Sequence, residues 1–193
     1  MKKIIIISLL LFILVLIGTT SFLLNLDKTI NQSTPDIQTT SLVSISKALD
    51  IVFDTKIILI LSLLITIFLY YKSSKKESFL FASIMIVSSL IIYLLKEIIA
   101  RARPLNSLIS STDLSFPSGH TTTAVVFFGL LIYLAWKNKS RYINQITTIS
   151  IILLAIISFS RIYLNAHWFS DVLASIFLGL FILFSGISIR KLF

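Results

Sequence analysis

Cysteine is absent from the 193 residues, and the sequence contains only two histidines, three prolines and five glycines. The lack of cysteine excludes disulfide bonds, thiolate catalysis and cysteine-bound metal centres. No proline interrupts a long apolar run, so nothing in these runs forces a kink. Charged residues make up only 13% of the chain. They do not recur every few positions, as the solvent-exposed face of a soluble domain requires.

Apolar residues dominate instead, at 56% of the chain, and the mean hydropathy is +1.00. A membrane-spanning helix needs about 20 mostly apolar residues. Six runs of that kind predict an all-α, polytopic membrane protein in which residues 1–193 form a single domain. The predicted helices cover residues 4–24, 51–71, 79–99, 119–136, 143–160 and 168–189.

The first run, preceded by Lys2 and Lys3, also resembles a secretory signal peptide. We favour an uncleaved helix, because residues 19–21 offer no clear small-residue cleavage site and the apolar run resumes at Phe22.

The net charge of +9 is distributed in short clusters between the runs, a pattern that sets membrane topology and does not predict nucleic-acid binding. The positive-inside rule predicts that both termini face the cytoplasm and that the regions 96–120 and 161–171 face the extracellular side of the cell membrane. The basic residues assigned to the cytoplasmic side are Lys2, Lys3, Lys72, Lys75, Lys76, Lys137, Lys139, Arg141, Arg190 and Lys191. Four outer cations break the rule and need another explanation: Lys96, Arg101, Arg103 and Arg161.

Residues 35–53 form an outer amphipathic segment. Thr34 is a plausible N-cap with Pro35 in the first turn, and apolar residues then recur at helical spacing. The segment is interpreted either as an interfacial helix beside a lipid entrance or as an extension of the second membrane helix that packs on the bundle. The second interpretation is slightly favoured.

The segment KEIIARARP places Lys96 and Arg103 seven residues apart. If the helix continues, this spacing projects both cations from one face. The alternative is that Lys96 reaches the lipid headgroups from a helix end. Arg101 is expected at the interface.

The segment FPSGH precedes the fourth run. Pro117 suits a first helical turn, Ser118 adds a hydroxyl, and Gly119 lets its N–H group approach a ligand closely. A helix N-terminus with free N–H groups is an anion site. His120 follows directly, and the alternative is a simple turn and cap.

The segment SRIYLNAHWFSD contains Arg161, His167 and Asp171. Asp171 lies four residues after His167, so on a helix its carboxylate can hold Nδ1–H and leave Nε2 free as a nucleophile. Arg161 can bind phosphate oxygens through its planar fork of N–H donors. The alternative is an interfacial belt of Arg161, His167 and Trp168.

Together the three segments, Lys-x6-Arg-Pro, Pro-Ser-Gly-His and Ser-Arg-x5-His-x3-Asp, resemble the three-part signature of the type-2 phosphatidate phosphatase superfamily. The positions that match this signature are Lys96, Arg103, Pro104, Pro117, Ser118, Gly119, His120, Ser160, Arg161, His167 and Asp171.

The resemblance implies a lipid phosphatase acting on undecaprenyl diphosphate, phosphatidylglycerophosphate or phosphatidate through a phosphohistidine. It implies that His167 is the nucleophile, Asp171 fixes its tautomer and His120 is the acid–base partner. The residues expected to bind the phosphate are Lys96, Arg103, Ser118, Gly119 and Arg161. No metal, cofactor, nucleic acid or obligatory protein partner is expected. A lipid phosphotransferase that uses the same phosphohistidine is the main alternative, and a non-catalytic protein that binds anionic lipids is a remote one.

Overall fold

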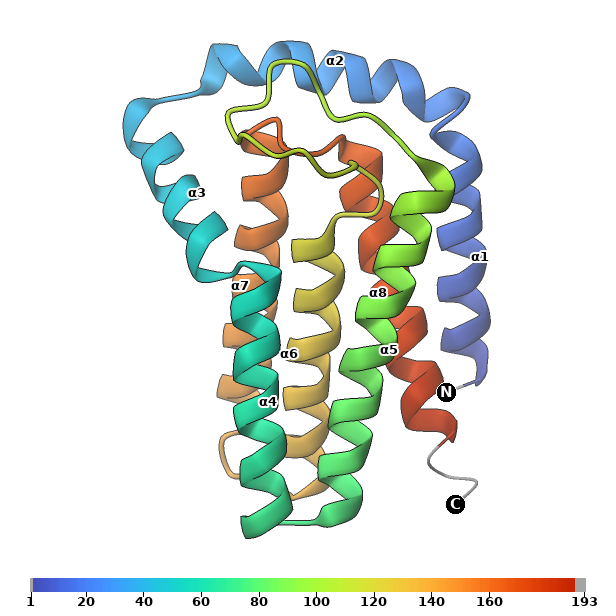
Figure 1. Cartoon of the computed structure of the whole chain (residues 1–193), viewed down its shortest axis with the longest axis vertical. Coiled ribbons are helices and arrows are strands. Elements are labelled where there is room, and N and C mark those ends of the chain that lie inside the picture. The colour runs from blue at the N-terminus through green and yellow to red at the C-terminus, as the bar shows by residue number, and fades with distance from the viewer. Residues whose placement is uncertain (1, 190–193) are drawn as a thin grey trace.

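The computed structural model describes residues 2–189, and every regular element in this range is a helix (Figure 1). The elements are α1 (Lys2–Gly18), α2 (Phe22–Ile37), α3 (Thr40–Val52), α4 (Thr55–Lys72), α5 (Lys75–Ile99), α6 (Gly119–Lys137), α7 (Ile143–Tyr163) and α8 (Phe169–Ile189). Arg190 and Lys191, which the sequence analysis places on the cytoplasmic side, lie outside the described residues.

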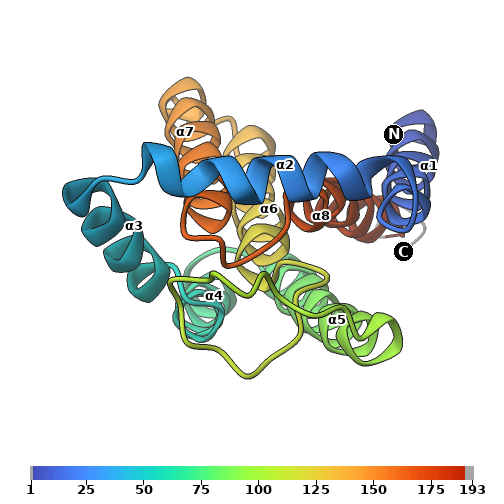
Figure 2. The same ribbon diagram turned by 90° about the horizontal axis from the view of Figure 1, so that it is seen from above.

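Helices α1 and α4 to α8 stand upright in a bundle, whereas α2 lies across one end of it and α3 runs down one side (Figures 1 and 2). The central helix is α6, which packs against α4, α5, α7 and α8, while α1 packs mainly against α8. Within residues 2–189, five helices (α4 to α8) are long and apolar enough to cross a membrane, and a sixth span is added if the bent pair α1–α2 counts as one. The predicted all-α, polytopic membrane fold is therefore confirmed.

The first predicted helix, 4–24, is wrong at its C-terminal end. Helix α1 ends at Gly18, and α2 leaves it at an angle of 75°. The hydroxyl groups of Thr19 and Thr20 donate to the carbonyl oxygens of Leu16 and Ile17, at 2.7 and 2.8 Å, where they compete with the backbone ladder. The apolar residues from Phe22 onward belong to α2, which becomes polar and lies across the bundle.

The expected amphipathic segment, 35–53, begins at a different residue in the structure. Thr34 and Pro35 lie in the last turns of α2, and the N-cap of α3 is Thr39, whose hydroxyl oxygen accepts from the Leu42 N–H at 3.3 Å. Helix α3 packs on α7 and is separated from α4 by residues 53 and 54. It is thus not a continuous extension of the second membrane helix, which begins at Thr55 and not at residue 51.

The remaining helices start and end within about four residues of the predicted limits. Where α6 and α8 cross, an added Cβ on Gly179 would come within 2.7 Å of Val125 Cβ and 3.2 Å of the Thr122 carbonyl oxygen. The missing side chain therefore lets the two backbones approach closely. Both helices begin at the end of the bundle that α2 covers, so this contact helps to fix the relative positions of their first turns.

Candidate active site

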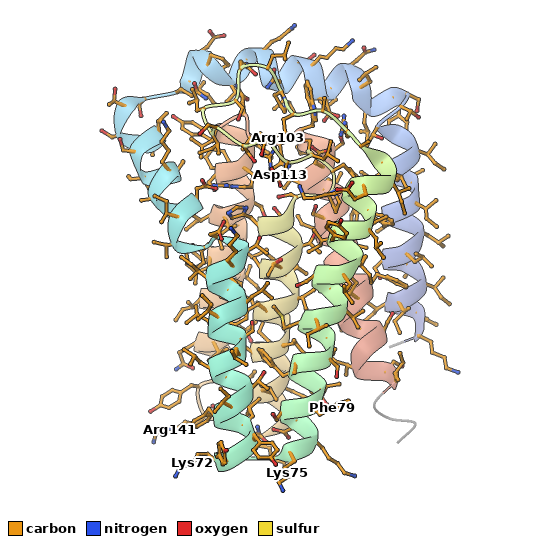
Figure 3. The ribbon with its side chains drawn as sticks, in the orientation of Figure 1. Lys72, Lys75, Phe79, Arg103, Asp113 and Arg141 are labelled. Atoms are coloured by element: carbon orange, nitrogen blue, oxygen red, sulfur yellow. The ribbon has the colours of Figure 1, made fainter. Side chains whose placement is uncertain are left out.

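The three sequence segments meet at the end of the bundle beneath α2, which we call the α2 end. The segment 100–118 winds over this end and places Arg103 and Asp113 there (Figure 3). The basic residues Lys72, Lys75 and Arg141 lie at the opposite end (Figure 3).

His167 is positioned by the turn that ends α7. The backbone N–H groups of Ala166 and His167 both donate to the Arg161 carbonyl oxygen, at 3.0 and 3.3 Å. Asn165 supplies the left-handed conformation that this turn requires, with φ of 50°. The result is a histidine that is only 3% exposed although it lies in a loop.

The backbone of Ser115 determines the protonation of the His167 ring. Nδ1 of His167 lies 2.6 Å from the Ser115 carbonyl oxygen. A carbonyl oxygen only accepts, so Nδ1 must carry the proton and Nε2 keeps its lone pair. Burial lowers the pKa of His167 below 6.5, and the positive charges of Arg103 and Lys96 lower it further, against the opposing effect of Asp171. The ring is therefore neutral near pH 7.

The structure assigns Asp171 a different geometry from the one predicted. Its nearer oxygen is 3.8 Å from His167 Nδ1, beyond hydrogen-bond range. That oxygen instead accepts from the Trp168 N–H at 3.0 Å and from the Ser115 hydroxyl. The expectation that Asp171 itself holds Nδ1–H is not met, because the Ser115 carbonyl oxygen already occupies that direction. Asp171 acts on the ring through its charge and through Ser115.

Lys96 and Arg103 do come together, but not on one helical face. Helix α5 ends at Ile99, where Ala100 adopts a left-handed conformation, so the chain turns between the two cations. They meet because both bind Asp113, with Lys96 Nζ 2.8 Å and Arg103 Nη2 2.6 Å from its carboxylate oxygens. Partial burial raises the pKa of Asp113, but hydrogen bonds from Lys96 and Ser111 outweigh it and hold the pKa below its usual value.

Arg103 also connects this pair to the turn that holds His167. Its Nη1 donates to the Ala166 carbonyl oxygen at 2.7 Å, next to His167. Lys96 and Arg103 thus lie on the His167 side of the site.

Arg161 and His120 share a second carboxylate, that of Asp50 at the end of α3. Arg161 is 2% exposed and donates to Asp50, while its Nε and Nη2 donate to Ser160 Oγ at 3.2 and 3.1 Å. His120 Nε2 lies 3.2 Å from both the carbonyl oxygen and a carboxylate oxygen of Asp50. Since the Arg161 backbone also anchors His167, the two halves of the site adjoin each other.

Ser118 is the N-cap of α6 and is fully buried. Its oxygen accepts from the Thr121 N–H at 3.4 Å, and its backbone N–H donates to Ser175 Oγ at 2.7 Å. Gly119, the first residue of the helix, is half-buried. The structure therefore gives Ser118 a capping role at the N-terminus of α6, which lies at the α2 end (Figure 1).

Sequence reasoning missed four residues of this site. Ser115 lies next to a motif, but its contribution is a backbone carbonyl, which no side-chain pattern reveals. Asp50 and Asp113 stand in the sequence as ordinary outer acidic residues. Asp27, whose buried carboxylate binds Arg101, had a usable signal, because it is an acidic residue directly after the mostly apolar residues 22–26.

Comparisons with known proteins identify the family to which the sequence is similar. The model of the PAP2 superfamily matches residues 77–191. A phosphatidylglycerophosphatase B from Bacillus subtilis is 33% identical over 94 residues, which are 47% of this chain and 46% of that protein. An undecaprenyl-diphosphatase from Sulfolobus acidocaldarius is 32% identical over 103 residues, which are 50% and 47% of the two chains. The match thus spans about half the length of each curated relative.

A solved structure shares the whole fold. The crystal structure of a transmembrane PAP2-type phosphatidylglycerolphosphate phosphatase from Bacillus subtilis superposes with a TM-score of 0.87 and 24% identity, over 99% of this chain and 97% of that one. The family model covers more than half of the chain and all three signature segments. The resemblance seen in the sequence is therefore confirmed, and the chain belongs to the PAP2 superfamily.

Proposed function

We propose that this protein hydrolyses the phosphate ester or diphosphate of a membrane lipid through a phosphohistidine at His167. The observation that carries the proposal is the state of His167. It is a buried neutral imidazole with Nδ1 fixed by a carbonyl oxygen, and the positive charges of Arg103 and Lys96 act on it. A free Nε2 next to concentrated positive charge is what in-line attack on phosphorus requires.

In the proposed first step, Nε2 of His167 forms a bond to phosphorus while the bond to the lipid oxygen, or to the leaving phosphate, breaks. Lys96, Arg103 and Arg161 neutralise the phosphoryl oxygens. Phosphoryl transfer depends mostly on positioning and charge, so these three cations can act without a metal. A chelator should therefore leave activity unchanged, and a loss that added metal restores would refute this part.

His120 is proposed as the acid–base partner. Its Nε2 faces the Asp50 carbonyl oxygen, 3.2 Å away, and a carbonyl oxygen accepts only a proton-bearing nitrogen. Nδ1 is then the atom that protonates the leaving oxygen and later takes a proton from the water that cleaves the phosphohistidine. Assistance of this kind contributes about a hundredfold to ten-thousandfold in rate.

The lipid comes from the membrane itself, and no protein partner is required. The names of the relatives suggest undecaprenyl diphosphate and phosphatidylglycerophosphate as candidate substrates. Phosphatidate is a third candidate, because it carries a phosphate monoester as phosphatidylglycerophosphate does. The deciding assay is phosphate release from these three lipids and from a soluble monophosphate. His167→Ala should abolish release, and normal turnover in that variant would refute the nucleophile. A phosphorylated acceptor with little free phosphate would indicate a phosphotransferase instead.

The site is proposed to face outward. It lies at the end of the bundle opposite Lys72, Lys75 and Arg141, and the positive-inside rule assigns such a cluster to the cytoplasm. Because the chain has no cysteine, single-cysteine labelling can test this. Ser110→Cys should react with an impermeant thiol reagent in intact cells, Ser74→Cys should not, and both should react after permeabilisation. The reverse pattern would indicate an inward-facing site.

A further inference from the structure

Arg101 is not the interfacial residue that the sequence suggested. Its side chain is only 14% exposed, and its guanidinium lies between two fully buried carboxylates. Nη2 is 2.7 Å from Asp27 Oδ2, while Nη1 binds Asp171 and also donates to Ser170 Oγ at 2.8 Å. The guanidinium carbon lies 5.5 Å from the centre of the Trp168 ring. Arg101 is therefore inside the bundle, directly behind the carboxylate that faces the nucleophile.

Asp27, which belongs to α2, continues this series of paired charges beyond Arg101. It is 1% exposed although it belongs to a helix that lies across the bundle (Figure 2). Its Oδ1 accepts from the Ser170 N–H at 2.8 Å, and its Oδ2 accepts from Arg101 and from the Ser170 hydroxyl. The Ser170 N–H is one of the first amides of α8, which have no partner inside their own helix. Asp27 thus caps α8 one residue before Asp171.

Negative and positive charges alternate along the series Asp27, Arg101 and Asp171, and this order affects the potential at His167. A buried carboxylate without a cation is costly, so Arg101 allows Asp171 to remain ionised. A guanidinium bound to Asp171 alone would also cancel much of the negative potential that reaches His167. Asp27 binds the other side of the same guanidinium and reduces this cancellation. The imidazole gains positive character when Nε2 is phosphorylated while Nδ1 keeps its proton, and that is when the charge of Asp171 is needed.

We propose that Arg101 and Asp27 are positioning residues that hold Asp171 ionised and oriented behind His167, so that α2 takes part in phosphoryl transfer. This inference rests on the proposed function. It assigns to α2 a role beyond covering the site, since its one buried carboxylate among residues 22–37 reaches the nucleophile through two intervening side chains.

The test compares Asp27→Asn, Arg101→Gln and Arg101→Lys with the unaltered protein by steady-state phosphate release. Asp36→Asn is the matched control, because it makes the same change at an exposed position of the same helix. Asp27→Asn should lower kcat about tenfold, and Arg101→Gln should lower it by at most about thirtyfold, the effect of losing the Asp171 charge itself. KM should stay within about twofold in both, because neither residue touches the phosphate-binding cations. Arg101→Lys should recover part of the loss.

Two further measurements separate positioning from stability. The variant that combines Asp27→Asn with Arg101→Gln should have the kcat of Arg101→Gln alone, because Asp27 acts through Arg101. Single-turnover experiments with a radiolabelled lipid phosphate should show slower formation of the phosphoenzyme in Asp27→Asn. If Arg101→Gln does not fold, Asp27→Asn and Arg101→Lys still provide the comparison.

The outcomes are distinguishable. Unchanged kcat in Asp27→Asn and Arg101→Lys, with only a lower melting temperature, would overturn the positioning role and leave the proposed function intact. A rise in KM with unchanged kcat would also overturn it. If the unaltered protein released phosphate from none of the lipids, the proposed function would fail, and this role with it.

Discussion

Replacing Asp171 with asparagine separates two roles that a carboxylate can have behind a catalytic histidine, namely fixing the tautomer and supplying charge. In this structure the Ser115 carbonyl oxygen, 2.6 Å from His167 Nδ1, fixes the tautomer, while the nearer Asp171 oxygen is 3.8 Å away. The Ser115 carbonyl oxygen accepts the hydrogen bond from His167 Nδ1–H regardless of which residue occupies position 171. We therefore expect the asparagine variant to keep Nδ1 protonated and to lose only the charge.

The size of that loss follows from the geometry. At an effective dielectric constant of about 20, unit charges 3.8 Å apart attract each other by about 4 kcal/mol. Arg101 binds the other oxygen of Asp171 and offsets about half of this attraction, so that about 2 kcal/mol remains. Since about 1.4 kcal/mol corresponds to a factor of ten in rate, kcat should fall by about thirtyfold.

The assay is steady-state phosphate release in detergent, with Asp36→Asn as the exposed control. Where an aspartate itself holds the tautomer of a catalytic histidine, replacement by asparagine lowers kcat by about 10⁴-fold. A loss of that size here would refute the reasoning, because it would mean that the Ser115 carbonyl oxygen does not fix the ring alone.

Three other predictions use single substitutions. In His120→Gln, His167 is the only histidine left, and its ¹⁵N NMR spectrum at neutral pH should show a neutral, Nδ1-protonated ring, because burial lowers its pKa below the usual value; a charged ring or the other tautomer would contradict this. Ala100→Gly should raise the free energy of unfolding by about 1 kcal/mol, because φ at this position is 48°. Thermal unfolding in detergent measures it, and a lower melting temperature would show that the turn is not strained. Asp113→Asn should lower the inhibition constant of inorganic phosphate about threefold, since it removes a half-exposed carboxylate that competes for two cations. A higher inhibition constant would show that Asp113 orders these cations.

The upright helices could be predicted because their apolar runs are long and bounded by charged residues. The break between α1 and α2 was missed, because the four small or polar residues 18–21 resemble a short interruption of one apolar run that resumes at Phe22. What ends α1 is the bonding of the Thr19 and Thr20 hydroxyls to the preceding turn, and this depends on side-chain conformation. The start of α3 was wrong for a related reason. Thr34 and Thr39 are both chemically competent N-caps, and only the packing of α2 across the bundle decides between them.

The site, like the fold, contains residues that could be predicted from the sequence and partners that could not. Lys96, His120 and His167 lie in compact motifs whose chemistry can be read from neighbouring residues. Their partners come from distant parts of the chain, since Ser115 precedes His167 by 52 residues and Asp50 precedes Arg161 by 111. A single sequence holds no information on such pairings beyond the presence of an acidic residue or a loop.

The carboxylates of the site fall into two classes that differ in exposure. The side chains of Asp27 and Asp171 are fully buried, and both bind Arg101, which does not belong to the predicted phosphate-binding set. The Asp50 side chain is 20% exposed and binds Arg161. The Asp113 side chain is 52% exposed and binds Lys96 and Arg103. These three cations are the ones in the predicted phosphate-binding set.

This difference follows from what each class has to do. Cations that wait for an anionic substrate in a low-dielectric environment need counter-charges that can move away, because an unpaired buried charge is costly. Under the proposed function, a lipid phosphate that binds these cations replaces the negative charge of Asp50 and Asp113, so we expect these two partly exposed carboxylates to turn toward water. In the proposed mechanism the buried pair, in contrast, stays in place throughout the reaction, because the positive charge that it stabilises develops on His167 only after the phosphate has bound.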